Sequence, residues 1–477
     1  MTLASQPMGW LRRDDRMRRT ALALAVYVLC TLVFFLLAKP ERLSEHTPFN
    51  HFALLAQSWL EGRLDLGGPP PAYAQMNDFA EFDGRWFITF PPFPAVLLVP
   101  WVWLAGGAEG VRDGQAFLWL AGVAPAVLFL VLEKLRRREH SKRNVLENLL
   151  LACAFAFGSV YFFTAEQGTV WFAAHVVGAA LCALYVLFAL DAERPLLAGL
   201  MLGLGFLTRA PLAFAAVLFA LEALRVCSVG GEGSESRAGG GEGDLARTQE
   251  SVKPPAEDES ARQRFSQWWQ RLDKRRLLRL YLSFAAPVAL CVAFYLWHNH
   301  ARFGSVSEVG YRFLKVRWAG RMEKWGLFHY HFLGRNLGVM LSSLPYWNKG
   351  PGAPFQINAH GLALWFTTPM YFWLLWPARG NAKRWLYRAL WVTVGAVAVW
   401  TLFYQNTGWQ QFGQRFSNDY AIFLFMLLAL GGRRFGWVFR AACVWAIVVN
   451  GFGAWSFDRP AARAYYVTNP AEYYQRD

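Results

Sequence analysis

The feature that most constrains this chain is a series of apolar blocks, each about 15 to 21 residues long and almost free of charge. An α-helix rises 1.5 Å per residue, so about 20 residues span the roughly 30 Å hydrocarbon core of a bilayer. Only 17% of the residues are charged, whereas a typical soluble domain has about 25%. The sequence therefore predicts an all-α polytopic membrane protein and excludes a soluble enzyme.

Basic residues beside the apolar blocks predict the orientation of the chain. An arginine-rich segment, 12–19, precedes the first block, 20–38, and loops rich in Lys and Arg remain in the cytoplasm. The stretch 91–107 is interrupted by prolines, and a crossing there would place the basic cluster 134–143 outside. We therefore expect 91–107 to lie at the outer face, or to re-enter it without crossing.

This choice predicts about eleven transmembrane helices, with the N-terminus in the cytoplasm and the C-terminus outside. The expected spans lie near residues 20–38, 114–133, 146–163, 170–190, 196–208, 211–226, 279–297, 361–377, 387–404, 418–431 and 436–455. The net charge of +15 is then explained by cytoplasmic loops, so it does not indicate a nucleic-acid partner.

The same pattern predicts the order of the parts. They are a basic cytoplasmic N-terminus (1–19), an N-terminal transmembrane module (20–226) with an outer loop (39–113), a cytoplasmic linker (227–278), a C-terminal transmembrane module (279–455) with an outer loop (298–360), and an outer tail (456–477). Within the linker, the Gly- and Glu-rich stretch 230–260 is typical of disorder. The following stretch, 263–279, mixes tryptophans with basic residues, as in an amphipathic helix on the inner leaflet.

Polar residues suited to building a site are concentrated in the predicted outer segments. The first outer loop carries Asp78, Glu81 and Asp83, followed by Arg85 and an aromatic, proline-rich stretch. Carboxylates at a membrane surface suit a general base or a hard cation. Three acidic residues in an exposed loop are, however, more often simply solvated.

Two later outer segments add cations and amides. The stretch RFGSVSEVGYRF contains Tyr311 and Arg312, which suit an anionic group such as a phosphate or, alternatively, an interfacial belt. The stretch GWQQFGQRFSNDY contains Gln411, Arg415 and Asp419. An Arg415–Asp419 ion pair across one helical turn is the structural interpretation, and amides beside it suit a hydroxyl-rich ligand.

Two ionisable residues lie within or beside the predicted spans. His175 and Arg209 are close to the outer ends of their blocks, where a polar side chain normally faces the bundle interior or a cavity. The six cysteines are inside or at the ends of apolar blocks and include no CxxC pair, so neither disulfides nor structural zinc is expected.

The arrangement resembles the GT-C superfamily of membrane glycosyltransferases, the group of protein O-mannosyltransferases and lipid A aminoarabinose transferases. The resemblance lies in the long outer loop after the first span, the element WFITFPPFP, the turn Thr208-Arg209-Ala210-Pro211, and the motifs RFGSVSEVGYRF and GWQQFGQRFSNDY. It covers about residues 15–455 and implies a sugar donor on a polyprenyl phosphate, with inverting transfer to an envelope glycan, lipid or protein. It also implies a bacterial inner (cytoplasmic) membrane location with the site on the periplasmic face.

The resemblance further implies roles for individual residues. Members commonly carry an acidic pair soon after the first span, where this chain has only Glu41 and Glu45. An aspartate of the first outer loop acts as the base, so Asp78, Asp83 and Glu81 are the catalytic candidates and also the candidate ligands for Mg²⁺ or Mn²⁺. The expected substrate-binding residues are Arg85, Glu45, His51, His175, Arg209, Tyr311, Arg312, Gln411, Arg415 and Asp419.

Two other functions remain open from the sequence. A lipid or solute transporter without glycosyl transfer is the main alternative, and it would place charges at mid-membrane with paired broken helices. The polar residues gather at the outer face instead, which favours the enzyme. A scaffold for an envelope assembly is neither supported nor opposed by the sequence.

Overall fold

The computed structural model describes residues 8–228, 261–316, 318–348 and 352–467 of the chain. These residues are mostly helical. Their strands form two short antiparallel pairs, β1 (Phe79–Phe82) with β2 (Arg85–Ile88) and β3 (Tyr346–Trp347) with β4 (Phe355–Gln356). The predicted all-α class is therefore confirmed.

Seven helical segments of the described chain are long and apolar enough to cross a membrane. They are Asp15–Leu37 in α1 (Met8–Leu37), Asp113–Arg137 built from α5 (Asp113–Ala121) and α6 (Val123–Arg137), Val170–Ala192 with α9 (Val170–Ala189), Ala210–Cys227 with η4 (Ala210–Ala215) and α11 (Ala216–Cys227), α13 (Lys274–Phe303), α17 (Trp385–Phe403) and α19 (Trp437–Ser456). Shorter apolar helices are α4 (Phe93–Ala105), α7 (Val145–Phe157), α10 (Pro195–Phe206) and α18 (Ala421–Leu430). These helices support the predicted multi-pass character, while the count of eleven spans and their orientation stay predictions.

The remaining described helices are short or lie at the ends of the bundle. They are α2 (Pro40–Ser44), α3 (His51–Leu60), α8 (Tyr161–Ala165), α12 (Ala261–Gln270), α14 (Ala319–Trp325), α15 (Leu333–Ser342) and α16 (Leu364–Thr367), together with the 3-10 turns η6 (Tyr311–Phe313), η8 (Pro369–Leu374) and η10 (Arg415–Asp419).

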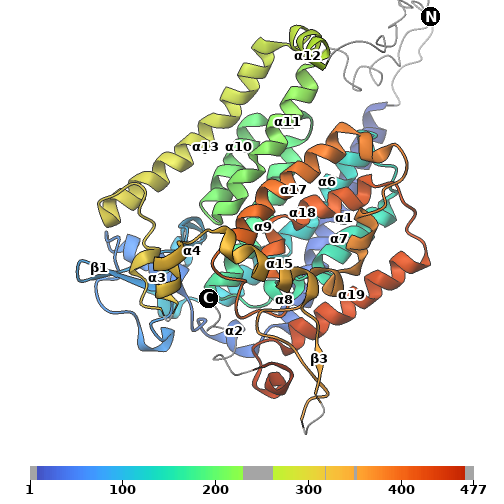
Figure 1. The fold of residues 1–477 in the computed structure, drawn as a ribbon. Helices are drawn as coiled ribbons and strands as arrows, with labels where there is room; N and C mark the ends of the chain where they lie inside the picture. The colour runs from blue at the N-terminus through green and yellow to red at the C-terminus, as the bar shows by residue number, and fades with distance from the viewer. Residues whose placement is uncertain (1–7, 229–260, 317, 349–351, 468–477) are drawn as a thin grey trace, which may run out of the picture.

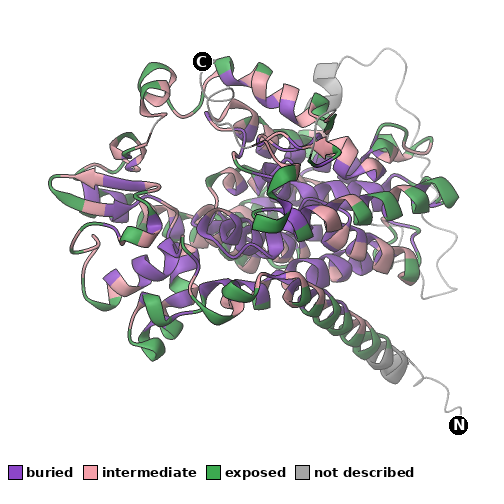
Figure 2. Ribbon diagram, turned by 90° about the horizontal axis from the view of Figure 1, so that it is seen from below, coloured by how far each residue is buried: buried purple, intermediate pink, exposed green. Residues whose placement is uncertain are grey.

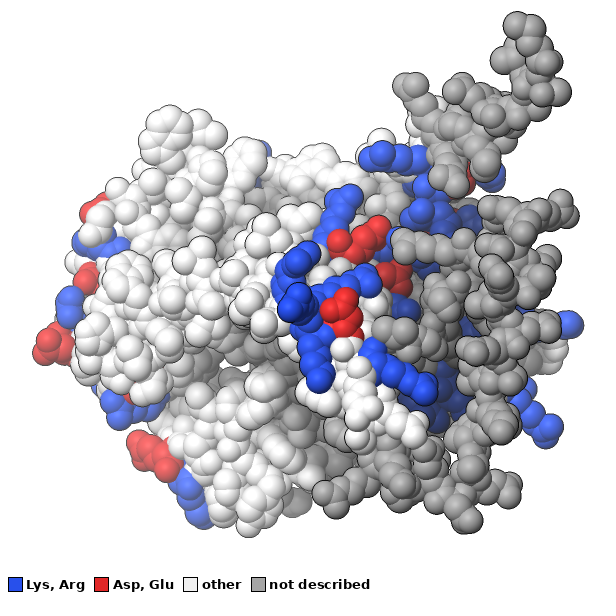
Figure 3. All heavy atoms as spheres, turned by 90° about the horizontal axis from the view of Figure 1, so that it is seen from above, with Lys and Arg blue, Asp and Glu red and all other residues white. Residues whose placement is uncertain are grey.

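The long helices run between two ends of the molecule (Figure 1). We call the end that carries α12 and the basic loop 138–144 the basic face, and the opposite end, with the β1–β2 hairpin, the hairpin face. Viewed from the basic face, a central group of Lys and Arg with a few acidic residues lies beside a broad area of other residues (Figure 3). The positive-inside rule predicts that the basic face is cytoplasmic.

The core lies along α9 and α18. All ten residues of α18 are buried, and 78% of the most apolar window of α9 is buried, against only 11% for α13. Figure 2 shows buried residues in the middle of the bundle and exposed ones along its sides. Exposed leucines on α13, such as Leu282 and Leu290, therefore belong to a surface suited to lipid.

Helices α10 and α13 pack closely because two glycines face the contact. A Cβ added at Gly199 would lie 2.0 Å from the backbone oxygen of Phe284, and one at Gly203 would lie 2.7 Å from Sγ of Cys291. Small residues spaced four apart allow helix backbones to approach in membranes. This pair therefore fixes how α13 docks on the bundle.

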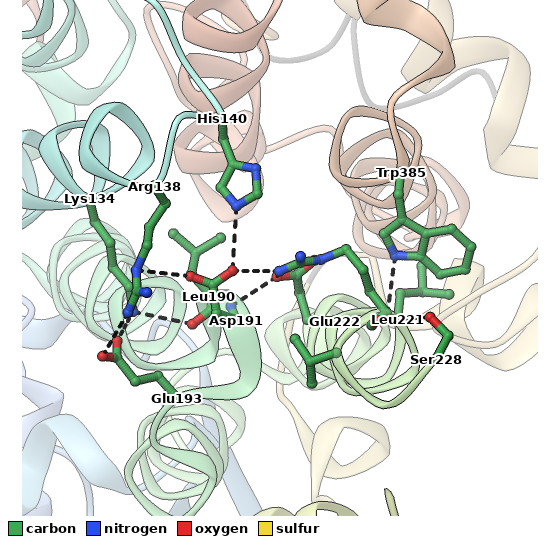
Figure 4. A network of polar contacts seen from close by, with 12 residues as sticks. Lys134, Arg138, His140, Leu190, Asp191, Glu193, Leu221, Glu222, Ser228 and Trp385 are labelled. Atoms are coloured by element: carbon green, nitrogen blue, oxygen red, sulfur yellow. Dashed lines mark hydrogen bonds and ion pairs between the residues drawn. The ribbon is translucent and has the colours of Figure 1, made fainter. Parts of the chain in front are cut away.

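A polar network holds the ends of α6, α9 and α11 together at the basic face (Figure 4). Asp191 accepts a hydrogen bond from Arg225 and lies 3.3 Å from Arg138 Nε. Lys134 Nζ lies 2.6 Å from Glu193 Oε2. Because each pair joins different helices, the network fixes the lateral order of this end of the bundle.

Helix α4 stays at the hairpin face. The backbone N–H of Phe93 donates to the carbonyl of Leu207, just beyond the end of α10 (2.9 Å). After α4 ends, the N–H of Ala108 donates to Oε1 of Gln57 in α3 (2.9 Å). Both ends of α4 are thus tied to elements of the same face, and the element expected at 91–107 does not cross the bundle.

The stretch 361–377 differs from the continuous helical span that we expected. The chain does run between the faces, because Leu362 pairs with Gly413 and the N–H of Ala378 donates to Gly431. It does so as α16 and η8, which are broken at Thr367–Pro369 because proline has no N–H to continue the helix. Asn450 Nδ2 donates to the carbonyl of Thr367 at 2.7 Å. This bond satisfies a backbone carbonyl that the break leaves without a helical N–H partner.

The predicted linker can be followed only at its ends, since 229–260 lies outside the described residues. The amphipathic helix expected over 263–279 is divided in two, because α12 ends at Gln270 and α13 begins at Lys274. Asp273 accepts a hydrogen bond from the N–H of Arg276 (3.0 Å) and caps α13, as carboxylates do at helix N-termini. All six cysteines are free thiols.

Candidate functional site

An ion pair between Arg209 and Asp419 lies at the hairpin-face end of the core. Arg209 immediately precedes η4, and Asp419 is the last residue of η10 before α18. The guanidinium binds the carboxylate with two nitrogens, and its Nη2 donates to Oδ2 at 2.7 Å. His175 of α9 adds its Nδ1 at 3.3 Å from Oδ1 of Asp419. Asp419 is only 2% exposed, so this is a buried, bidentate pair.

The Arg415–Asp419 pair that the sequence suggested is not formed. The residues 415–419 form a 3-10 turn instead of an α-helix, and in that geometry side chains three apart, not four, are aligned. Asp419 therefore faces Arg209, and Arg415 points elsewhere.

Arg415 is a buried cation without a close anionic partner. Its side chain makes no hydrogen bond or ion pair with the described residues, and the buried Nε has no acceptor there. The guanidinium lies over the rings of Phe172 (4.9 Å) and Phe416 (5.6 Å). Burial lowers the pKa of Arg415, and the like charge of Arg209 lowers it further. Both effects show that a cation here is poorly compensated.

The two arginines flank one aromatic ring. The guanidinium carbon of Arg209 lies 5.5 Å from the centre of the Phe416 ring, and that of Arg415 lies 5.6 Å from the same centre. Two neighbouring guanidinium groups, only one of them paired, form a place where an anion such as a phosphate would be stabilised.

Asp78 supplies a carboxylate to the same neighbourhood. It precedes β1 with φ of 60°, a left-handed conformation that Asp adopts more readily than most residues. Trp171 Nε1 donates to its Oδ2 at 2.7 Å, and Oδ1 has no hydrogen bond from the described residues. Burial raises the pKa of Asp78, while the Trp171 hydrogen bond and the charge of Arg415 oppose that rise. One anchored and one free oxygen, with a raised pKa, suit a general base.

Two tyrosines complete the group. Tyr311 in η6 and Tyr404 after α17 both interact electrostatically with Asp78 and Arg209. Burial, together with the charge of Asp78, raises the pKa of Tyr404 to about 12. Neutral hydroxyl groups at this place can donate to or accept from a polar substrate.

The structure thus gathers six predicted residues from five separate segments, since Arg415 and Asp419 both belong to η10. They are Asp78, His175, Arg209, Tyr311, Arg415 and Asp419. We call this group the outer polar site. Gln411 lies behind it, fully buried, where its Nε2 donates to the carbonyls of His360 and Thr407 and its Oε1 accepts from the N–H of Arg415. Gln411 therefore positions the Arg415 loop.

Sequence reasoning missed Trp171 and Tyr404. Trp171 is four residues before His175 in α9, so the two share a helix face. That spacing was a usable signal for Trp171. Tyr404 carried no signal beyond being an aromatic residue at the end of a span.

The other predicted residues of the first outer loop lie elsewhere. Glu81 pairs with Lys315 at 3.2 Å. Asp83 is exposed in the turn between β1 and β2. Arg85 is exposed and lies 3.6 Å from Asp65.

Of three further predicted residues, one lies beside the site and two are exposed. His51 is buried, with Nε2 at 2.8 Å from the carbonyl of Asn77, the residue before Asp78, and with its ring centre 6.2 Å from that of Trp171. Glu45 is exposed just after α2. Arg312 is exposed and pairs with Glu308 at 2.6 Å.

The three candidate ligands for Mg²⁺ or Mn²⁺ do not converge. The four residues of β1 separate Asp78 from Asp83, and at about 3.3 Å per strand residue their backbones are more than about 10 Å apart. Among the described residues, no group of three His, Cys, Asp or Glu side chains is placed to hold a metal ion. The residues present do not fit a shared metal site.

A second buried polar cluster joins the two ends of the chain. Arg42 Nη1 lies 3.1 Å from Glu166 Oε2, and Arg42 Nη2 lies 2.6 Å from Gln167 Oε1 and 3.2 Å from Asp458 Oδ2. Burial raises the pKa of Glu166 to about 7. The ties from Arg42 to Asp458 connect the segment after α1 to the segment after α19, which indicates a structural role.

Comparisons with protein-family models, with curated proteins and with solved structures found no match. What the protein does has to be inferred from the chemistry of the outer polar site.

Proposed function

We propose that this chain is an integral-membrane glycosyltransferase that moves a sugar from a polyprenyl-phosphate donor to an envelope glycan, lipid or protein acceptor. The observation that carries the proposal is that the outer polar site contains both a carboxylate suited to act as a base and a cation suited to bind a phosphate. Asp78, a carboxylate with a free oxygen, is held by Trp171, and the buried and poorly compensated Arg415 lies over the ring of the next residue, Phe172. Transfer of a sugar from a lipid phosphate requires a base and a phosphate-binding cation close together.

In the proposed reaction Asp78 acts as general base. Its Oδ1 accepts the proton of the acceptor hydroxyl while that oxygen forms a bond to C1 of the donor sugar. The bond between C1 and the phosphate oxygen breaks, and its electron pair leaves with the polyprenyl phosphate. A single displacement of this kind inverts the configuration at C1. The burial that raises the pKa of Asp78 makes it a stronger base.

The two arginines stabilise the departing phosphate in this proposal. The phosphate would be the first close anionic partner of Arg415, and Arg209, whose guanidinium lies at a similar distance from the Phe416 ring, adds a second positive charge nearby. Asp419 holds Arg209 in a fixed orientation through two hydrogen bonds. Preorganised cations at the place where negative charge develops lower the barrier because they need not reorient during the reaction.

The test is transfer of labelled sugar from a panel of polyprenyl-phosphate sugars to envelope extracts, using the purified full chain. We expect Asp78→Asn to lose about 10²- to 10⁴-fold in turnover while donor binding is retained. Asp83→Asn is the matched control, because Asp83 lies exposed in the hairpin turn, and it should keep full turnover.

Three outcomes would overturn the proposal or part of it. Loss of turnover in Asp83→Asn but not in Asp78→Asn would reassign the base. Absence of both donor binding and turnover with every donor would refute the enzyme. Movement of the intact donor across a reconstituted bilayer without sugar transfer would support the transporter that the sequence left open.

A further inference from the structure

A cavity of about 380 Å³ opens at the basic face, at the opposite end of the molecule from the outer polar site. Three connections line it: the α6–α7 loop, the segment before α17, and the segment between α18 and α19. Its charged lining residues are Lys142, Arg143, Arg384, Arg434 and Glu147. Four Lys or Arg against one Glu make a net charge of +3, which favours an anionic ligand.

The frame of the cavity is fixed by hydrogen bonds to the last carbonyls of α18. Arg143, Ser141 and Asn381 donate to the carbonyls of Leu428, Ala429 and Leu430, respectively. These bonds satisfy the negative end of the α18 dipole. The carbonyl oxygens therefore do not oppose an anion in the cavity.

The frame of the cavity packs closely around Gly432 because this residue has no side chain. Gly432 has φ of 72°, and a Cβ there would lie 2.4 Å from Nδ2 of Asn381 and 3.2 Å from Cβ of Ala378. All three residues line the cavity. The wall of the cavity is therefore close-packed at this point.

Part of the positive charge in the cavity has no partner. Lys142 and Arg434 are exposed, and neither makes a hydrogen bond or ion pair with the described residues. Arg143 is 6% exposed and bonds Glu147 through Nη1, but its buried Nε–H has no acceptor in the described part of the chain. A nearly buried guanidinium with an unused donor points to a ligand that brings an acceptor.

Helix ends add to the positive potential. Helix α17 begins directly after Arg384, and α19 begins at Trp437, three residues after Arg434. Neither N-terminus is capped by a side chain of its N-cap residue. The N-terminal ends of helices carry partial positive charge and free N–H groups, which favour phosphate.

Exposed tryptophans place the cavity at the level of lipid headgroups. Trp376 (61% exposed) and Trp437 (80% exposed) lie next in the chain to two of the lining segments. Exposed Trp side chains gather where a membrane meets water. A ligand in the cavity would lie within reach of the leaflet at the basic face.

We propose that this cavity binds a phosphate-bearing anion, with the phosphate monoester headgroup of an anionic lipid as the favoured source. Lys142 and Arg434 supply charge-assisted hydrogen bonds to the phosphate, and the nearly buried Arg143 lines the same cavity. The proposal does not depend on the glycosyltransferase proposal, because no residue is shared with the outer polar site.

The test uses the purified full chain in a non-ionic detergent with short-chain phosphatidic acid as the probe, measured by saturable binding. Diacylglycerol of the same chain length is the uncharged comparison, and inorganic diphosphate is the soluble one. The double substitution Lys142→Gln with Arg434→Gln should weaken phosphatidic acid binding by at least about tenfold, since each change removes a charge-assisted hydrogen bond. Both side chains are exposed and without partners in the described residues, so the fold is expected to persist.

The matched control is Lys383→Gln with Arg440→Gln, which removes two exposed cations near the same face that do not line the cavity. Equal loss of binding in both double variants would show a nonspecific charge effect and overturn the proposal. Absence of saturable binding to both phosphatidic acid and diphosphate would also overturn it. Tight diphosphate binding, with phosphatidic acid no better, would support the phosphate site and assign it to a soluble ligand.

Discussion

At the scale of single residues, the outer polar site contains two arginines in opposite electrostatic situations. Arg209 has a bidentate carboxylate partner, whereas Arg415 has none within ion-pair distance among the described residues. Burying a charge without a partner costs free energy, while breaking a buried pair leaves its partner uncompensated. The two residues should therefore respond differently to the same substitution.

We expect Arg415→Met to leave the thermal stability of the purified protein unchanged or higher, and to weaken donor binding. Arg209→Met should instead lower stability by roughly 3 to 5 kcal/mol, because it leaves Asp419 buried and unpaired. Thermal unfolding in detergent and donor binding are the two measurements. A loss of stability in Arg415→Met as large as that in Arg209→Met would mean that Arg415 has a structural partner.

A second residue-scale prediction concerns the pH dependence of turnover. Asp78 must be unprotonated to act as a base, so turnover should fall as the pH decreases through its pKa, which burial raises above the ordinary value. The Trp171 hydrogen bond stabilises the charged form. Trp171→Phe should therefore raise that pKa and move the acid side of the kcat/KM profile to higher pH.

The control for this prediction is Trp101→Phe on α4, where the side chain is exposed. Its pH profile should match that of the unmodified protein. An acid limb that does not move in Trp171→Phe would show that the titrating base is a different carboxylate.

At the scale of elements, the docking of α13 depends on the glycines of α10. Gly199→Ala would place a methyl group 2.0 Å from the carbonyl oxygen of Phe284, which belongs to rigid backbone. The helices must then separate, and we expect a loss of stability of roughly 1 to 3 kcal/mol. Thermal unfolding of the full chain in detergent measures it.

Gly395→Ala in α17 is the matched control, because a Cβ there meets nothing within 4 Å. In a helix interior that change should be neutral or stabilising by about 0.5 to 1 kcal/mol. Similar losses in both variants would mean that helix propensity and flexibility, rather than the α10–α13 approach, determine the effect.

At the scale of the whole molecule, the cluster of Arg42, Glu166 and Asp458 joins the segments after α1 and after α19. The Glu166 carboxyl loses its proton near pH 4.5 when unfolded and near pH 7 when folded. Between these two pH values the folded state binds more protons than the unfolded state. The free energy of unfolding should therefore decrease as the pH rises, and the decrease should be complete above pH 7.

Thermal midpoints between pH 4.5 and 8 test this expectation. The unmodified protein should lose a few degrees across that range, and Glu166→Gln, which carries no titrating proton, should lose less. Parallel curves for the two proteins would place the pH dependence in another group.

Much of the architecture could be predicted from the sequence, because hydropathy and charge are properties of local windows. The multi-pass helical class and the confinement of 91–107 to one face both follow from such windows. The stretch 361–377 was expected to be one helix, since its hydropathy is that of a span. Its break at Thr367–Pro369 is tolerated only because Asn450, from α19, satisfies the freed carbonyl.

The sequence by itself determined a helical chain with apolar blocks long enough to cross a membrane and with polar residues gathered in a few of the segments between them. Only the tertiary structure decided which of those residues meet. Asp78, Arg209 and Arg415 belong to distant segments, and their approach depends on how α9, η4 and η10 pack. A local pattern suggested Arg415 with Asp419, but the 3-10 geometry of η10 turned Asp419 to Arg209 and left Arg415 available. Side-chain partners across helices depend on packing, which no local window contains.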